Sequence, residues 1–183
     1  MRVVSGTARG TVLSAPDGLQ TRPTADRAKE ALFSMIAPSV SGCAFLDLFC
    51  GSGAIGIEAL SRGAASCCFV DNSAAAIQAV QKNLVKTKLD ARAELLCAEA
   101  AEVVNRLSRR GVAFDIVFLD PPYGAALVQK TVDGLLSSDV LAKDGLCIAE
   151  QGAAEAVPVF HGLRLIKQKR YGAAAILVYE VDV

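Results

Sequence analysis

The tetrapeptide Asp120-Pro121-Pro122-Tyr123 has the residue types needed to hold a flat amine. Its two prolines fix the backbone and donate no N–H, so the carbonyl of Pro121 is left as an outward acceptor. Asp120 supplies a second acceptor, and Tyr123 supplies a ring on which a base can stack. We predict that these four residues are catalytic and bind an exocyclic amino group. A rigid turn that closes a strand, with Tyr123 as packing, is the competing interpretation.

A glycine-rich turn from Phe45 to Gly56 leaves a predicted strand and enters a predicted helix. Gly51 and Gly53 let the backbone approach a ligand, and the free amides at the helix start are expected to face it. The string G-x-G-x-x-G also fits a dinucleotide, so alone it does not separate NAD from other nucleoside cofactors. Asp47 would repel a pyrophosphate and favours a cofactor with a cationic amino-acid tail and a sulfonium, which is S-adenosyl-L-methionine.

Two further acids follow predicted strands. Asp71 ends the second strand, where a carboxylate can accept both hydroxyls of a ribose. Glu99 follows the third strand and could accept from an adenine amino group, although an acid that suits a helix N-terminus is the alternative. The predicted cofactor-binding residues are Asp47, Phe49, Cys50, Gly51, Ser52, Gly53, Asp71, Asn72, Glu99, Ala100 and Asp120.

Short apolar runs alternate with helix-period segments from Phe45 onward, which predicts an α/β fold with a parallel sheet. The predicted strands are Ala44–Leu48, Ser66–Val70, Ala93–Cys97, Phe114–Leu119 and Leu146–Glu150. The predicted crossover helices are Ala54–Arg62, Ala74–Lys86, Ala100–Arg109 and Ala125–Ser138. Two last strand-like runs, Leu163–Arg170 and Ala175–Val181, predict a hairpin that closes the sheet with an antiparallel strand.

The segment before the first strand differs in composition. Met1–Leu13 predicts an extended arm or small hairpin, Thr24 is expected to open a helix, and Pro38 is expected to end it. We predict one methyl-group-transferring domain over residues 1–183, with the arm and helix at 1–38 and a Rossmann-like core at 44–183. The apolar face of the helix contains Ala28, Leu32, Phe33 and Ile36.

Composition excludes several classes of protein. The chain is 52% hydrophobic and 21% charged, without an apolar run long enough to cross a bilayer or a charged-then-apolar leader at Met1, so we predict a soluble, cytoplasmic protein. Its six cysteines form no C-x-x-C pair, which favours reduced, buried thiols over disulfides or zinc. No metal site is predicted, and His161 is expected at the surface.

The formal net charge is zero, but the basic residues are clustered. One cluster lies in the first thirty residues and another near the C-terminus, and either could be a solvated face or a binding surface. The first cluster contains Arg2, Arg9, Arg22, Arg27 and Lys29, and the second contains Arg164, Lys167, Lys169 and Arg170.

These motifs together resemble a known family. The tetrapeptide and the run from Asp47 to Gly53 look like those of amino-methyltransferases of the class I S-adenosylmethionine fold. The blocks Thr21–Arg27 and Gly51–Gly63 are similar to those of the bacterial 16S rRNA guanine-N2 methyltransferase family. The resemblance covers the chain from the arm to the last hairpin. Glu99 is a departure, because many relatives carry Asp at that position.

This resemblance implies a Rossmann-like, doubly wound, seven-stranded sheet with an antiparallel last strand. It also implies S-adenosyl-L-methionine as the methyl donor and N2-methylation of a guanine in 16S rRNA, alone or in an assembling small ribosomal subunit. Neither a membrane, a metal nor an oligomer is implied. Because a base-flipping enzyme needs phosphate contacts around its pocket, the basic clusters are expected at the rim. The predicted RNA-binding residues are Arg9, Arg22, Thr24, Arg27, Lys167, Lys169 and Arg170.

Other functions remain open from the sequence. The tetrapeptide suits any exocyclic amine, so methylation of adenine N6 is an alternative. An NAD-dependent oxidoreductase would use the glycine-rich loop but would leave the tetrapeptide without a role. A non-catalytic RNA-binding assembly factor would use the basic clusters but would not need a cofactor loop. Covalent methylation of pyrimidine carbon 5 lacks its nucleophile, because no cysteine follows a proline at the end of the fourth strand.

Overall fold

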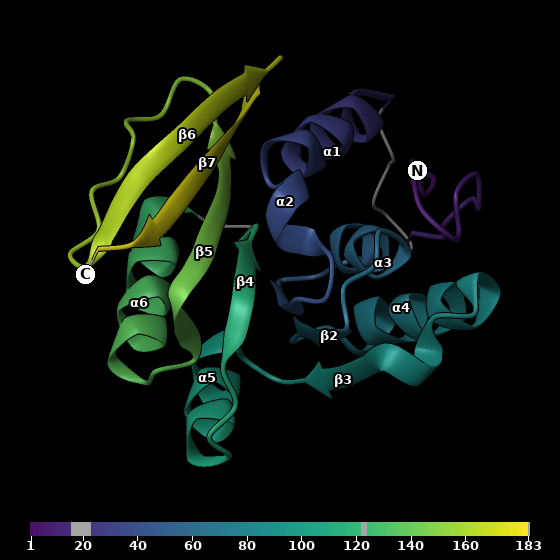
Figure 1. Cartoon of the computed structure of the whole chain (residues 1–183), viewed down its shortest axis with the longest axis horizontal. Helices are drawn as coiled ribbons and strands as arrows, with labels where there is room; N and C mark the ends of the chain where they lie inside the picture. Colours follow the sequence, from purple (N-terminus) through teal and green to yellow (C-terminus); the bar gives the residue numbers. More distant parts are fainter. Residues whose placement is uncertain (16–22, 122–123, 183) are drawn as a thin grey trace.

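The computed structural model describes the backbone of residues 1–15, 23–121 and 124–182, and the side chains of these residues except 23–25 and 124–126. Its strands are β1 (Ala44–Leu48), β2 (Ser66–Asp71), β3 (Ala93–Cys97), β4 (Phe114–Leu119), β5 (Leu141–Gly152), β6 (Leu163–Tyr171) and β7 (Ala174–Val181). Its helices are α1 (Pro23–Met35), α2 (Ala37–Val40), α3 (Ala54–Ser61), α4 (Ala74–Thr87), α5 (Ala100–Arg109) and α6 (Gly124–Ser137), with a 3₁₀ turn at Asp90–Arg92 (Figure 1).

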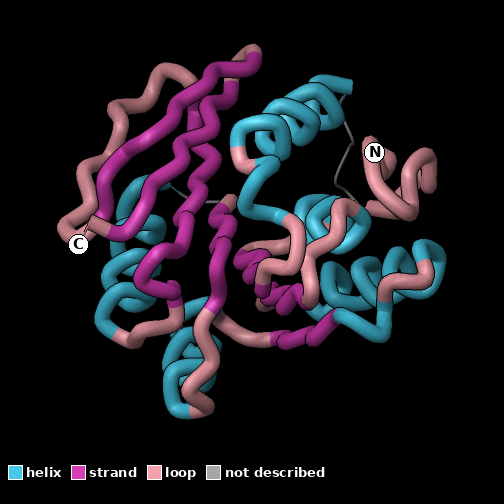
Figure 2. The backbone as a smooth tube through the Cα atoms, viewed as in Figure 1, coloured by secondary structure: helices cyan, strands magenta, loops and turns pink. Residues whose placement is uncertain are grey.

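The strands form one seven-stranded sheet in the order β3-β2-β1-β4-β5-β7-β6 (Figure 2). Strands β1 to β5 run parallel to one another, and β7 is antiparallel to both β5 and β6. The doubly wound sheet and the closing hairpin confirm the predicted fold class. The hairpin inserts its second strand, β7, beside β5, so β6 becomes the edge.

Alternate residues of each strand enter different cores, as period-two geometry requires. In β1, Phe45 packs with helices α1 to α4 on one face, whereas Leu46 packs with α5 and α6 on the other. Phe118 and Val117 of β4 divide in the same way. Strands β1 and β4 are therefore buried on both sides, which explains why they are mostly apolar runs in the sequence.

The structure corrects one predicted boundary and extends another element. Pro38 does not end α1, which stops at Met35; it lies in the first turn of α2, where a missing N–H costs no helical hydrogen bond. Strand β5 begins five residues before the predicted start at Leu146, because Leu141 already pairs with Phe114 before a register shift. The polar Lys143 and Asp144 hid this extension.

Gly56 lets helix α3 pack closely on strand β2. A Cβ at this position would lie 2.6 Å from the sulfur of Cys67 and would also overlap the ring of Phe69. The glycine of α6, Gly134, is different, since its nearest neighbour would be a Val104 methyl at 3.8 Å. The close approach of α3 fixes where the helix begins, directly after the glycine-rich turn.

We expect Gly56→Ala to lower the free energy of unfolding by about 1–3 kcal/mol, because the added methyl overlaps rigid neighbours. Gly134→Ala is the matched control and should raise stability by about 0.5–1 kcal/mol, as alanine does in a helix with space for it. Urea denaturation measures both. Equal effects of the two substitutions would show that the packing of α3 on β2 is not tight.

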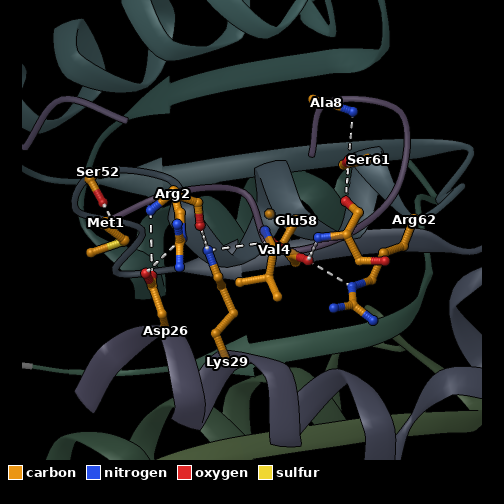
Figure 3. Close-up of polar contacts among 12 residues, drawn as sticks. Met1, Arg2, Val4, Ala8, Asp26, Lys29, Ser52, Glu58, Ser61 and Arg62 are labelled. Carbon is orange, nitrogen blue, oxygen red and sulfur yellow. Dashed lines mark hydrogen bonds and ion pairs between the residues drawn. The ribbon is translucent and has the colours of Figure 1, made fainter. Parts of the chain in front are cut away.

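The carboxylate of Glu58 in α3 is fully buried and joins three elements (Figure 3). Its oxygens lie 3.3 Å from Nζ of Lys29 in α1 and 2.8 Å from Nε of Arg62. They also accept from the backbone amides of Val4 and Ser5 in the N-terminal arm, at 2.8 and 2.9 Å. The pKa of Lys29 is lowered, because burial outweighs the attraction of Glu58.

The arm itself is a small hairpin, which agrees with one of the two predicted forms. Val3 donates to the carbonyl of Thr11, and Leu13 donates to that of Met1, both at 2.9 Å. Ser61 adds a second attachment, since its hydroxyl donates to Ser5 and accepts from the amide of Ala8. The arm is therefore fastened to α3 by polar contacts along its length.

Glu58→Gln should lower the free energy of unfolding by about 3–5 kcal/mol, because it leaves Lys29 buried without a counter-charge. Glu94→Gln is the control: Glu94 pairs with Arg110 at 2.7 Å, but their side chains are 41% and 43% exposed. That change should cost no more than about 1 kcal/mol. Chemical denaturation of both variants tests the contrast, and a loss below 1 kcal/mol for Glu58→Gln would contradict the role of this carboxylate.

Candidate cofactor loop and catalytic edge

The predicted site residues follow neighbouring strands at one edge of the sheet. Strand β1 lies between β2 and β4, with Leu48 paired to both Val70 and Leu119. Because these strands are parallel, the segments that follow them leave the sheet at the same edge. The structure therefore brings the glycine-rich loop next to Asp71 on one side and next to Asp120 on the other.

Asp47 lies beneath the loop and is 1% exposed. One of its carboxylate oxygens accepts from the amide of Gly56 at 2.9 Å. Burial raises the pKa of Asp47 to about 7; the hydrogen bond from Gly56 opposes this shift, and the charges of Asp120 and Asp71 add to it. The geometry gives Asp47 the role of bracing α3 against β1, and its direct contact with a cofactor stays a prediction.

Asp71 fastens the loop from its other side. One carboxylate oxygen accepts from the amide of Gly51 and the other from the amide of Ser73, both at 2.9 Å. Gly53 donates to the carbonyl of Cys50 at 2.7 Å. The amides of Gly51, Gly53 and Gly56 are therefore bonded to protein acceptors. The expectation that amides at the helix start face a ligand stays a prediction for Ala54 and Ile55, the first two residues of α3.

Positive φ angles shape the loop. Phe49 has φ 64°, Gly51 has φ 52°, and Gly53, the N-cap of α3, has φ 74°. A side chain on Gly51 would meet no atom within 4 Å, whereas one on Gly53 would lie 3.0 Å from a methyl of Val80. Gly51 thus borders open space, and Gly53 is required by its backbone angle and by contact with α4.

Other predicted cofactor residues lie around this loop. Asn72 donates to the carboxylate of Glu99 at 2.9 Å, which joins the segments after β2 and β3; both residues are exposed. Glu99 is the N-cap of α5 but makes no capping bond with its side chain. The carbonyl of Ser52 accepts from Asn83 at 2.9 Å, and Asn83 also exchanges two hydrogen bonds with Ser14 at the end of the arm. Cys50 and Ala100 are buried.

Asp120 and Pro121, which follow β4, line a cavity of about 290 Å³. Partial burial raises the pKa of Asp120 to about 6. Glu150, at the end of β5, lines the same cavity, and burial together with the charge of Asp120 raises its pKa to about 7. The sequence prediction missed Glu150, although its place at the end of a predicted strand was a signal. Pro122 and Tyr123 lie outside the described residues.

A family model described as Conserved hypothetical protein 95 matches residues 1–180. The chain belongs to this family. Ribosomal RNA small subunit methyltransferase D of Escherichia coli K12 is 35% identical, over 98% of this chain and 89% of its own length. The protein of the same name from Haemophilus influenzae is 30% identical, over 98% and 93% of the two chains.

Solved structures agree with this membership. The Escherichia coli protein yhhF matches with a TM-score of 0.88 and 30% identity, over 100% of this chain and 98% of that chain. SMU.776, solved in complex with SAH, has the same fold with a TM-score of 0.72 and 18% identity, over 90% of this chain and 52% of that chain.

In this member of the family, the helix that carries Arg27 and the strand that carries the C-terminal basic cluster are neighbours. Helix α1 lies against β6, and Lys167 of β6 donates to the carbonyl of Met35 at 2.6 Å. Arg27 of α1 is exposed, as are Lys169 and Arg170 of β6. Arg9 is exposed in the arm, whereas Arg22 and the side chain of Thr24 lie outside the described part of the chain. RNA contact by these residues stays a prediction.

Within the described residues, no helix is long and apolar enough to cross a membrane, and no three His, Cys, Asp or Glu side chains are grouped to hold a metal. All six cysteines are free, and five of them are buried, with Cys97 exposed.

The raised pKa of Asp47 predicts a pH-dependent difference in stability. Its ordinary value is 3.8, so this group stabilises the fold fully below that pH and loses the contribution as the pH rises to about 7. Asp47→Asn keeps an acceptor for Gly56 but cannot ionise. Its free energy of unfolding relative to the parent should therefore rise between pH 4 and 7 and level off above.

Urea denaturation of both proteins at each pH measures this difference. Asp90→Asn, which removes an exposed charge, is the control for a general effect of net charge. A difference between parent and Asp47→Asn that is the same at every pH would contradict the assignment of Asp47 as a strained buried carboxyl.

Proposed function

We propose that this protein transfers a methyl group from S-adenosyl-L-methionine to the exocyclic N2 amine of a guanine in small-subunit ribosomal RNA. The observation that carries the proposal is the position of Asp120 and Pro121, which leave β4 beside the loop that leaves β1. An acceptor pair for an amine thus adjoins the candidate cofactor loop. Two relatives named as small-subunit rRNA methyltransferases support the class of substrate.

The loop suits S-adenosyl-L-methionine better than a dinucleotide. A pyrophosphate would bind at the start of α3, where the carboxylates of Asp47 and Asp71, bonded to the amides of Gly56 and Gly51, would repel its charge. The nearby carboxylates of Asp47 and Asp71 favour a cationic ligand. Asp71 keeps lone pairs for the ribose hydroxyls, and the open side of Gly51 leaves room for the cofactor. SAH in a neighbour of the same fold agrees with this choice.

The bound cofactor would supply an electrophilic methyl group on a sulfonium. Asp120 and the carbonyl of Pro121 would accept hydrogen bonds from the two N–H groups of the base amine. The lone pair of the amine would then point away from these two acceptors. As the amine nitrogen bonded to the methyl carbon and the methyl–sulfur bond broke, positive charge would pass from sulfur to nitrogen, where the Asp120 carboxylate would stabilise it. With a pKa of about 6, Asp120 is mostly ionised at neutral pH and can take up the proton that the product releases.

The RNA would lie over α1 and β6. Arg27, Lys169 and Arg170 are exposed on these adjacent elements and provide cations for phosphates. Arg9 extends this surface toward the arm. A basic rim beside an acidic cavity would place the backbone of the RNA outside and the flipped base inside.

Asp120→Asn should lower single-turnover methyl transfer on the order of a hundredfold, because the amide still accepts a hydrogen bond but no longer opposes the developing charge. SAH affinity by calorimetry should change little. The assay follows labelled methyl from S-adenosyl-L-methionine into 16S rRNA or 30S particles. Asp144→Asn, on an exposed part of β5, is the matched control and should keep the parent rate. Transfer at the parent rate by Asp120→Asn would place the amine elsewhere.

A further inference from the structure

The cavity beside Asp120 has acidic walls. It is lined by segments after β4 and β5, by α6 and by the turn before β7, and its volume of about 290 Å³ suits one small ring system. Asp120, Glu150 and Glu155 are among its lining residues, whereas none of the described lining residues is basic. Such a cavity favours a ligand that presents hydrogen-bond donors.

Strand register places Asp120 and Glu150 side by side. Phe118 pairs with Ile148, and both side chains pack in the core beneath α1 to α4. The register ends with Leu119 paired to Ala149, so the residues that follow them, Asp120 and Glu150, are neighbours, and both line the cavity. Neighbouring strands are about 4.8 Å apart, so the two carboxyls can contact adjacent atoms of one ligand.

The hydrogen bonds of Glu150 differ from those of Glu155, another acid that lines the cavity. One carboxylate oxygen of Glu155 accepts from the amide of Gly152 at 3.2 Å, so Glu155 closes its own turn. No hydrogen bond or ion pair to the Glu150 carboxylate comes from the residues that the structure describes. Its acceptor capacity faces the cavity, and the cost of holding a half-buried carboxylate there is not offset by a protein donor.

We infer that Glu150 is a specificity-determining residue that selects guanine over adenine by accepting the N1–H of the base while Asp120 holds its amine. The inference rests on the proposed function. Guanine presents N1–H directly beside its N2 amine, which matches two adjacent carboxylates. Adenine presents an N1 lone pair beside its N6 amine, and that lone pair repels a carboxylate. The tetrapeptide alone makes no such distinction.

Mass spectrometry of RNA fragments first locates the methylated position in 16S rRNA. The test then compares RNA substrates with guanine or 2-aminopurine at that position. 2-Aminopurine keeps the N2 amine but carries a lone pair at N1. At about pH 8, above the pKa of Glu150, the parent should strongly prefer guanine. Glu150→Gln should reduce the ratio of kcat/KM values, guanine over 2-aminopurine, on the order of ten- to a hundredfold, because an amide can either accept from N1–H or donate to the lone pair.

Glu155→Gln is the matched control, since it neutralises another acid of the same cavity and should leave the ratio unchanged. Glu150→Asp should slow guanine methylation yet keep the preference, and it provides the test should Glu150→Gln not fold. An unchanged ratio in Glu150→Gln, with guanine methylation intact, would overturn the inference alone. A fall in SAH affinity with an unchanged ratio would instead assign Glu150 to the cofactor. If the parent protein methylates no guanine, the proposed function itself is wrong.

Discussion

The buried carboxylate of Glu58 is the interaction on which the arrangement of the site depends. A charge without water must be matched by donors, and here the donors come from Lys29, Arg62 and the amides of the arm. The N-terminal hairpin, α1 and α3 are therefore held as one unit. Since α3 begins at the end of the glycine-rich loop, the position of that loop depends on a contact made one helical turn later.

Charge is distributed unevenly even though the whole chain is neutral. Carboxyls gather where the parallel strands end. Burial raises the pKa values of Asp47, Asp120 and Glu150, and the charge of Asp120 adds to the shifts of Asp47 and Glu150. Basic side chains lie outside this edge, on α1 and β6. A cationic cofactor and a donor-rich base suit the acidic interior, and a polyanion suits the basic exterior. Net charge alone conceals both properties.

The sequence predicted what depends on local pattern. Strands β1 to β4 are short, mostly apolar runs, so they were placed with errors of at most one residue at either end. Strand β5 was too short in the prediction, because its bulged beginning contains Lys143 and Asp144. Pro38 was misplaced because proline both follows a helix and starts the next one. Polar residues occur in loops as well as at a bulged strand start, and proline occurs both after a helix and in its first turn, so neither local signal decided the boundary.

Contacts that depend on strand register or on distant segments of the chain could not be predicted from the sequence. Glu58 lies in a helix whose sequence gives no sign that the arm, more than fifty residues away, donates to it. Asp47 was identified as a site residue, but its bond to Gly56 exists only once α3 folds back on β1. Glu150 lies near Asp120 only because β4 pairs with β5. Motifs thus located the edge of the sheet, and tertiary structure divided the acids between those that support the loop and those that line the cavity.

The basic strand β6 shows how one set of charges can serve two physical needs. As an edge strand, it has unpaired backbone groups, and exposed lysine and arginine discourage another chain from pairing with them. The opposite edge, β3, is only five residues long, and its Glu94 is paired with Arg110. Protection of the sheet would account for basic residues on β6 without any RNA. It does not account for the exposed side chain of Arg27, which belongs to helix α1. Because α1 packs against β6, Arg27 continues the basic surface beyond the strand. The extension of positive charge onto a helix favours a polyanion as the second reason for this surface.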